Sequence, residues 1–304
     1  MGTVETVGLV LHPRRDSKTA IDTIIEWARA RNVTVLGSPE EVGRIDCSAV
    51  AVDAAELVDR ADLLVSLGGD GTMLRTMRLL AGRPTPVLGV NLGRLGFLPE
   101  IDVDELPSAL SAIDDRRHTV EPRMAVRTVL PEAPEVTAFN DIALVRTPGH
   151  GLSEVAVSVE GHPFVRYASD AVIVATSTGS TAYSFSAGGP LVSPTVEGFL
   201  VVPAAAHSVF NRAVVLSADE EVTLEVLPTS GRLAVEVDGS VVGHLSPGQR
   251  ISVTAVRAAA RVVRLGTTTF YERARRKLRV SGSAEVDWEL PESAGIKENL
   301  QWPM

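Results

Sequence analysis

In the first part of the chain, segments whose hydrophobic residues have the spacing of a helix alternate with short hydrophobic runs typical of strands. Residues 7–11 and 33–36 are short apolar runs, and between them apolar residues recur at three- and four-residue spacing from Ile21 to Ala28. Short apolar runs are typical of buried strands, and spacing near 3.6 is typical of an amphipathic helix. Residues 61–90 repeat the order strand, helix, strand. This alternation predicts a parallel α/β sheet.

A different period governs the middle of the chain. Apolar and polar residues alternate strictly over residues 155–159, 222–226 and 233–237. Such alternation is typical of strands that bury one face. Residues 160–163, Glu-Gly-His-Pro, form a turn signal, and Asp238-Gly239 between two alternating runs is a strong hairpin signal. This part is predicted to be all-β, with antiparallel sheets packed as a sandwich.

The change of period divides the chain into predicted parts. Residues 1–117 are expected to form the α/β domain, and residues 118–266 the β-sandwich domain. Residues 267–280 contain several arginines and a lysine, and we expect a basic helix that returns to the first domain. Residues 281–304 carry Pro and Gly without a clear period, and are predicted to be a tail.

The first candidate chemistry lies in the sequence GGDGT at 68–72, between an apolar run and residues with helical spacing. The C-terminal end of a parallel strand, followed by a helix N-terminus, is where open α/β sheets bind ligands and where backbone N–H groups face anions. A carboxylate repels phosphate, so Asp70 is better suited to a hydroxyl proton or a metal. The structural alternative is a tight turn followed by a helix cap.

Two familiar phosphate-binding motifs do not fit this loop. A dinucleotide fingerprint that starts at Gly69 finds Leu74 at its third glycine position, and Val90 where the ribose acid is expected. A Walker loop needs Gly-Lys, and none of the three lysines follows a glycine. These lysines are Lys18, Lys277 and Lys297.

A second block of polar residues follows the predicted strand 171–175. It is rich in serine, threonine and glycine and contains Tyr183. Short hydroxyls and backbone amides at this density can hold a ribose and phosphates without a lysine. A solvated Ser/Gly-rich loop without a function is the structural alternative. A serine-hydrolase elbow does not fit, because Ser184 takes the glycine position before Ser186.

Composition narrows the class of protein. With 45% hydrophobic and 22% charged residues, the 304-residue chain can bury a sizeable core. Its net charge of −9 argues against non-specific nucleic-acid binding. The single cysteine, Cys47, excludes an internal disulfide and supports no metal cluster. No signal peptide is visible and no apolar run approaches ~18 residues, so we expect a cytoplasmic protein without a membrane span.

Three segments together resemble the NAD kinase family. These are GGDGT at 68–72, NLGRLGFL at 91–98 and TGSTAYSFSAGGP at 178–190, and their order and spacing match to about residue 278. GGDGT alone is shared with phosphofructokinases and diacylglycerol-type lipid kinases, whereas TGSTAY followed by SAGGP is far more specific. The resemblance implies transfer of a phosphoryl group from ATP to the 2′-hydroxyl of the adenosine ribose of NAD, giving NADP.

The resemblance also implies partners and architecture. Mg²⁺ is expected to arrive with ATP, and no protein metal site is expected. Some members of the family use inorganic polyphosphate as donor. A homodimer or homotetramer is implied, as are an N-terminal α/β domain and a C-terminal β-sandwich domain.

Residue by residue, the resemblance makes Asp70 the base or orienter of the attacking hydroxyl. The positions implied to contact NAD are Gly71, Phe97, Asn140, Asp141, Asp170, Ser177, Thr181, Ala182, Tyr183, Ser186 and Asp238. The positions implied to contact phosphates or ATP are Gly68, Gly69, Thr72, Arg94, Thr178, Gly179 and Ser180. The chain departs from the family pattern at five positions: Asp141 replaces a glutamate, Ser177 a common proline, Ala171 a glycine, and Ala206 and Ala213 two prolines.

Two other functions stay open at the level of sequence. One is another kinase of the GGDGT superfamily that acts on a lipid or a sugar. The other is a non-catalytic protein that senses NAD. For Phe97 an ordinary core position is an equal alternative, and for Asp238 a hairpin turn is an equal alternative.

Overall fold

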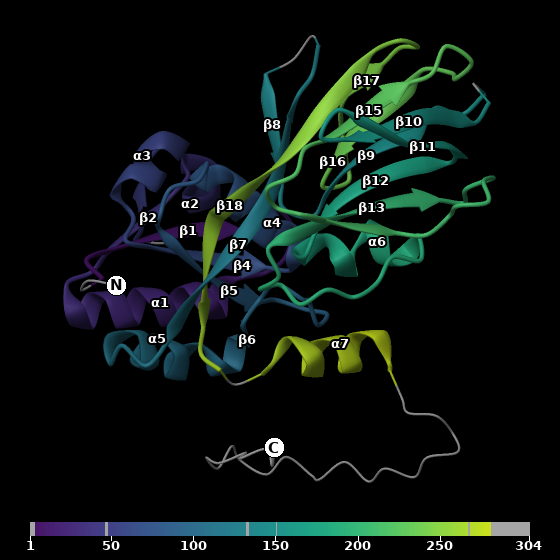
Figure 1. Cartoon of the computed structure of the whole chain (residues 1–304). Coiled ribbons are helices and arrows are strands. Elements are labelled where there is room, and N and C mark those ends of the chain that lie inside the picture. Colours follow the sequence, from purple (N-terminus) through teal and green to yellow (C-terminus); the bar gives the residue numbers. More distant parts are fainter. Residues whose placement is uncertain (1–3, 46–47, 132–133, 150, 267, 281–304) are drawn as a thin grey trace, which may run out of the picture.

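The computed structural model describes residues 4–45, 48–131, 134–149, 151–266 and 268–280. The predicted tail, residues 281–304, and Cys47 lie outside the described residues. Figure 1 shows an α/β part, a β-sandwich beside it, and a last helix below their junction. Among the described residues, every helix is too short or too polar to span a lipid bilayer.

The first part alternates strands and helices, as its apolar pattern predicts. Its elements are β1 (Thr6–Leu11), α1 (Lys18–Arg31), β2 (Thr34–Gly37), α2 (Pro39–Ile45), β3 (Val50–Ala51), α3 (Ala54–Arg60), β4 (Leu63–Gly68), α4 (Asp70–Leu80), β5 (Pro86–Asn91), β6 (Ile101–Asp102), η1 (Val103–Glu105) and α5 (Leu106–Asp114). Strands β5, β4, β1, β2 and β3 lie side by side in parallel.

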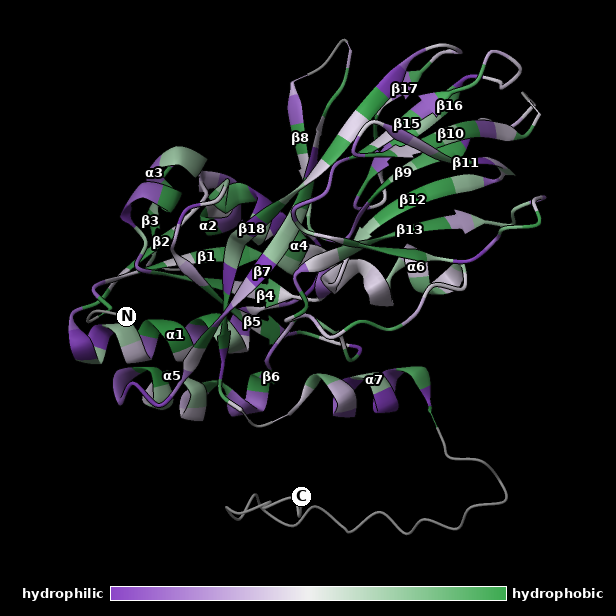
Figure 2. Cartoon of the chain, in the orientation of Figure 1, coloured by the Kyte–Doolittle hydropathy of each residue, from purple (hydrophilic) through white to green (hydrophobic). Residues whose placement is uncertain are grey.

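Helices cover both faces of this parallel sheet. Side chains of α1 and α5 pack with one face of β1 and β4, and side chains of α3 and α4 pack with the other face. Because both faces are covered, every residue of β4 is buried. Figure 2 shows apolar residues concentrated on the strands, while the helices carry both apolar and polar residues.

The later elements are mostly strands. They are β7 (Thr119–Val129), β8 (Glu135–Ala138), β9 (Asp141–Arg146), β10 (Ser153–Val159), β11 (His162–Ser169), β12 (Ala171–Thr176), η2 (Thr178–Thr181), α6 (Tyr183–Ser186), β13 (Gly198–Ala204), β14 (Val214–Ser217), β15 (Val222–Val226), β16 (Leu233–Val237), β17 (Ser240–Leu245), β18 (Arg250–Arg264) and α7 (Phe270–Leu278).

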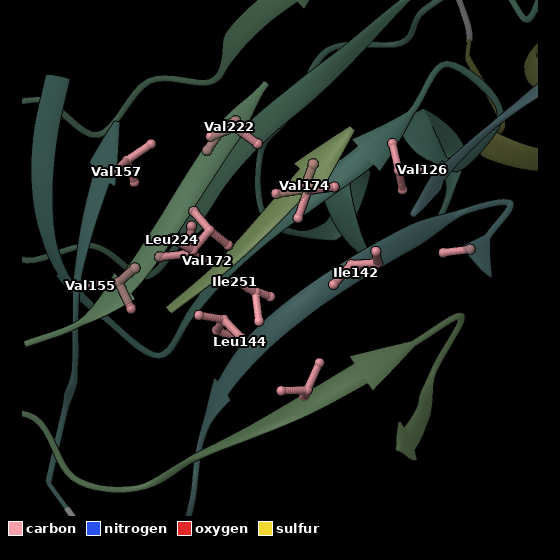
Figure 3. Close-up of a cluster of buried hydrophobic side chains, with 14 of the residues drawn as sticks. Val126, Ile142, Leu144, Val155, Val157, Val172, Val174, Val222, Leu224 and Ile251 are labelled. Carbon is pink, nitrogen blue, oxygen red and sulfur yellow. The ribbon is translucent and has the colours of Figure 1, made fainter. Parts of the chain in front are cut away.

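Two antiparallel sheets form the sandwich. One has the order β14-β13-β12-β9-β16-β17, and the other contains β11, β10, β15 and β18. The alternating valines and leucines of both sheets fill the space between them, among them Val155, Leu224 and Val235. Figure 3 shows Val172, Leu144 and Ile251 of this cluster pointing into the shared interior. The predicted all-β half and its sandwich architecture are confirmed.

One long strand joins the two parts, which the local patterns do not predict. Near the end of β18, Arg261 and Val262 pair in parallel with β5, while its first residues pair antiparallel with β15, and β7 pairs antiparallel with β18 from Val253 to Arg264. The α/β sheet and one layer of the sandwich are therefore a single 12-stranded sheet. This continuity fixes the carboxyl end of β4 relative to the sandwich.

Local turn signals gave correct predictions. Residues Glu160 and Gly161 connect β10 to β11, both with positive φ. Asp238 (φ +46°) and Gly239 (φ +77°) connect β16 to β17, the two left-handed residues that a type I′ hairpin turn needs. The predicted basic helix is α7, where Thr269 and Glu272 form a capping box.

Candidate active site

Asp70 is the first residue of α4 and follows the buried strand β4 directly. Its Oδ1 accepts hydrogen bonds from the backbone N–H groups of Phe97 and Leu98, at 2.8 and 2.9 Å. A Cβ at Gly96 would lie 2.5 Å from the same oxygen, so only glycine lets this loop approach so closely. The carboxylate is thus held in one orientation while its side chain stays 31% exposed.

The other oxygen of Asp70 pairs with a lysine from the end of the chain. Lys277 Nζ on α7 lies 2.8 Å from Asp70 Oδ2 and 4.4 Å from the centroid of the Phe97 ring. Phe97 is 8% exposed, and its ring also faces Phe270 at 6.4 Å. We predicted a basic helix here but not this contact, because 207 residues separate the two charges.

The glycines around Asp70 leave different amounts of space. A Cβ at Gly68 would lie 2.1 Å from Thr72 Oγ1, so Gly68 and the buried Thr72 are needed for the turn itself. A Cβ at Gly69 or Gly71 would meet no protein atom within 4 Å. These two positions leave the backbone open to a ligand. Arg94 is exposed and forms no ion pair with a carboxylate in the described part of the chain.

The second polar block packs against the loop before β9. A Cβ at Gly179 would lie 2.0 Å from the Asn140 carbonyl oxygen, and Thr176 Oγ1 donates to the Phe139 carbonyl while accepting from Gly179 N–H. Glycine at this position therefore lets the block lie directly on Asn140.

Hydroxyls within the block fall into two groups. Ser177 and Ser180 are buried, and their hydroxyls donate to the carbonyl oxygens of Pro194 and Val192. These two side chains organise the loop from inside. Thr181, Ala182, Tyr183 and Ser186 are partly or fully exposed, as is Phe185.

Asp238 organises the loop that carries Asn140 and Asp141. Its fully buried carboxylate accepts hydrogen bonds from the backbone N–H groups of Phe139, Asn140 and Asp141, at 3.2, 2.7 and 3.3 Å. Arg78 NH1 lies 3.8 Å away. Burial raises the pKa of Asp238, against the opposing effect of these N–H groups and Arg78. The Asp-Gly pair is therefore a hairpin turn whose side chain also positions the neighbouring loop.

Asp141 is a buried carboxyl in an electronegative setting. It is 4% exposed. Burial, followed by the charges of Asp238 and Glu236, raises its pKa to about 7, while the backbone N–H of Tyr183 acts in the opposite direction. The group is poised to change protonation near neutral pH, and a ligand hydroxyl that donates to it would favour its ionised form.

Asp170 and Ser177 lie at opposite ends of β12, roughly 20 Å apart for a strand of this length. Asp170 pairs with Arg146 Nε at 2.6 Å. Tyr183 packs on the outer face of the sheet between them. Burial raises the pKa of Tyr183, as do the charges of Glu236, Asp170 and Asp141.

A cluster of ion pairs that the sequence did not predict lies next to the site and joins the loop at residues 97–100 to β7, β18 and α7. Glu100 accepts from Arg273 at 2.5 Å and from Arg264 at 2.7 Å. Arg123 is 2% exposed, pairs with Glu121, and lies 3.5 Å from Thr178 Oγ1. Burial and the charge of Arg264 lower the pKa of Arg123 to about 9. An anion close to Arg123 would stabilise the charged form of this buried guanidinium group.

A cavity of about 270 Å³ lies between the loop that carries Phe97, the buried Arg123 and the start of α7. Phe97, which leans on the Asp70 site, lines it together with Arg123, which contacts Thr178, and Phe270. The arrangement places an oriented carboxylate, a lysine and an open glycine loop near a hydroxyl-rich loop. This combination suits removal of a proton from a sugar hydroxyl beside a phosphate group.

No group of three His, Cys, Asp or Glu in the parts of the chain that the structure covers could hold a metal ion. Both oxygens of Asp70 already have partners, two backbone N–H groups and Lys277.

Comparison with known proteins gives consistent matches. The ATP-NAD kinase N-terminal domain matches residues 7–118, and the ATP-NAD kinase C-terminal domain matches residues 139–265. An NAD kinase of Moorella thermoacetica is 39% identical, with 99% of this chain and 97% of the relative covered. NAD kinase 1 of Streptomyces avermitilis is 38% identical, with 92% and 88% covered.

Solved structures agree. A yeast NADH kinase complexed with NADH superposes with a TM-score of 0.80 at 25% identity, covering 96% of this chain and 91% of that one. An NAD kinase of Archaeoglobus fulgidus in complex with ATP gives a TM-score of 0.71 at 27% identity, with 91% and 100% covered.

Proposed function

The chain belongs to the ATP-NAD kinase family, and on that basis we propose that Asp70 is the base in its reaction. The protein is an NAD kinase: it transfers a phosphoryl group from ATP to NAD and produces NADP. The observation that carries the assignment of Asp70 is its geometry. One carboxylate oxygen is fixed by two backbone N–H groups, and the other pairs with Lys277, in a side chain that is 31% exposed at the carboxyl end of β4.

The proposed step is a single displacement at phosphorus. The 2′-hydroxyl of the adenosine ribose gives its proton to Asp70 Oδ2, and its oxygen forms a bond to the terminal phosphorus of ATP. The bond from that phosphorus to the bridging oxygen breaks, and ADP leaves with the electron pair. Because the protein does little covalent chemistry in such a transfer, positioning and charge neutralisation carry the rate.

The open backbone at Gly69 and Gly71 is the proposed cradle for the phosphates, together with the N-terminus of α4. Mg²⁺ bound to the ATP phosphates would supply charge neutralisation. Arg94, which is exposed, stays a prediction as a further phosphate-binding residue. The buried Thr72 and Gly68 shape the turn that presents the cradle.

NAD is proposed to bind along the hydroxyl-rich loop. Asn140 and Asp141 would contact the adenosine, because Asp238 and Gly179 fix their backbone beside this loop. Thr181, Ala182, Tyr183 and Ser186 would contact the dinucleotide directly, since they remain at least partly exposed. Phe97 would form the apolar wall next to Asp70. Asp170 near the nicotinamide and a homodimer or homotetramer stay predictions from the family resemblance, and a cytoplasmic location stays a prediction from the sequence.

A coupled assay tests this function. Purified protein is supplied with NAD or NADH, Mg²⁺, and either ATP or polyphosphate, and NADP or NADPH is measured. We expect NADP from NAD and ATP, and loss of product when EDTA removes the metal. Product with polyphosphate would extend the donor range. Folded protein that binds NAD but forms no product with either donor would refute the kinase and support an NAD sensor.

A further inference from the structure

Helix α7 lies outside both family matches, which end at residue 118 and at residue 265, but it reaches the proposed base. Among the residues that the structure covers, Lys277 is the lysine in contact with the candidate site, while Lys18 pairs with Asp22 on α1. The role of Lys277 therefore has to be argued from its contacts.

One face of α7 packs along its whole length against the loop formed by residues 97–100. Phe270, Arg273 and Lys277 are spaced by three and four residues and so share that face. Phe270 packs near Phe97, and Arg273 donates to the Pro99 carbonyl at 2.6 Å and to Glu100.

The same loop is held from its other side by Asp70, which accepts the N–H groups of Phe97 and Leu98. Arg273 is 3% exposed and Glu100 is 5% exposed, so their ion pair anchors the helix firmly. Lys277, in the last turn, is the exposed end of this face, with a side chain 32% accessible. The anchor fixes the backbone of α7, while the half-exposed lysine side chain is held only at its end, by Asp70 and the Phe97 ring.

The ion pair creates a chemical conflict that arrival of the donor would resolve. An ammonium group 2.8 Å from Asp70 Oδ2 occupies the oxygen that the 2′-hydroxyl must reach. The transferring phosphoryl group spreads its negative charge over three oxygens and so offers the ammonium group a second anionic partner. A lysine is a compact charge on a flexible four-carbon stem, so it can exchange one anion for the other without movement of the helix.

We propose that Lys277 is a catalytic residue that moves from Asp70 to the transferring phosphoryl group. There it neutralises the charge on the phosphoryl oxygens, and its departure frees Asp70 Oδ2 for the hydroxyl proton. Lys277 keeps its own protons: the proton of the 2′-hydroxyl goes to Asp70, the new O–P bond forms, and the bond to ADP breaks. The inference rests on the kinase function proposed above.

The test compares Lys277→Met with Arg275→Met, which removes a charge from an exposed position in the same turn of α7. Methionine keeps an apolar stem beside Phe97. We expect kcat of Lys277→Met to fall about 10²–10³-fold, as for loss of one transition-state donor, with the KM for NAD within about threefold. Arg275→Met should keep the wild-type kcat.

Chemical rescue separates this role from a structural one. Lys277→Ala should lose activity similarly and regain it with added n-propylammonium, which replaces the missing stem and charge. A kcat of Lys277→Met within about threefold of wild type would overturn the inference, as would an equal loss in Arg275→Met. Loss without amine rescue, together with a lowered Tm, would assign Lys277 to anchoring α7. Wild-type protein that forms no NADP would overturn the kinase function, and the inference with it.

Discussion

Asp141→Asn should make the protein more stable at alkaline pH, while weakening its binding of NAD. The substituted group is nearly the same size, and the site is 4% exposed. In the wild type, burial and the charges of Asp238 and Glu236 raise the pKa of Asp141 from 3.8 to about 7. The folded state therefore holds a proton that the unfolded chain releases near pH 4.

The sign and size of the effect follow from this difference in proton binding. Between about pH 4 and pH 7 the folded state binds more protons, so the free energy of unfolding falls as pH rises. Above pH 7 the full cost is present, at most about 4 kcal/mol for a shift of roughly three units. Asparagine cannot ionise. Its advantage over the wild type should grow by roughly 2–3 kcal/mol between pH 5 and pH 8.

Urea unfolding at pH 5 and pH 8 measures this difference, with the exposed Asp104→Asn as a matched control. The control should change stability by less than about 0.5 kcal/mol at either pH. An advantage of Asp141→Asn that is the same at both pH values would refute the argument. Calorimetry should show weaker NAD binding by the variant, because an amide accepts ribose hydroxyls less well than a carboxylate.

Two other substitutions test the supports of the site. Gly179→Ala would place a Cβ 2.0 Å from the Asn140 carbonyl oxygen, so NAD binding by calorimetry should be lost. Gly43→Ala, where a Cβ meets nothing within 4 Å, should bind normally, and normal binding by both variants would contradict the reasoning. Glu100→Gln would leave the buried Arg273 without its carboxylate and remove one of the two carboxylates that pair with Arg264, and it should lower the free energy of unfolding by about 3–5 kcal/mol. A loss below about 1 kcal/mol in urea unfolding would show that the cluster is not a stabilising anchor.

The local pattern of apolar and polar residues predicted those helices, strands and turns that residues close in sequence determine. The strand before GGDGT, the helix after it, and the turns at 160–163 and at Asp238-Gly239 all follow from short-range periodicity and turn chemistry. The division into an α/β part and a sandwich followed from the change of period. The NAD kinase family followed from three motifs in order.

Contacts between residues far apart in the sequence could not be predicted from these local patterns. Strand β18 joins both parts into one sheet because Val262 pairs with Val87 of β5, and no local period encodes that partner. The contact of Lys277 with Asp70 spans 207 residues, and the buried Arg123 appeared only once β7 was placed beside β18. The motifs also do not show that the hydroxyls of Ser177 and Ser180 donate hydrogen bonds to backbone carbonyl groups of the same loop. The direct NAD contacts stay predictions.

The most direct measurement is the kcat of Asp70→Asn, with NAD binding followed by calorimetry. Asparagine keeps an oxygen for the N–H groups of Phe97 and Leu98, so the loop should hold and the Kd for NAD should stay within about threefold. Loss of a general base should lower kcat by about 10²–10⁴-fold. That result would support Asp70 as the group that receives the 2′-hydroxyl proton. A kcat near the wild-type value, with NAD still bound, would contradict it.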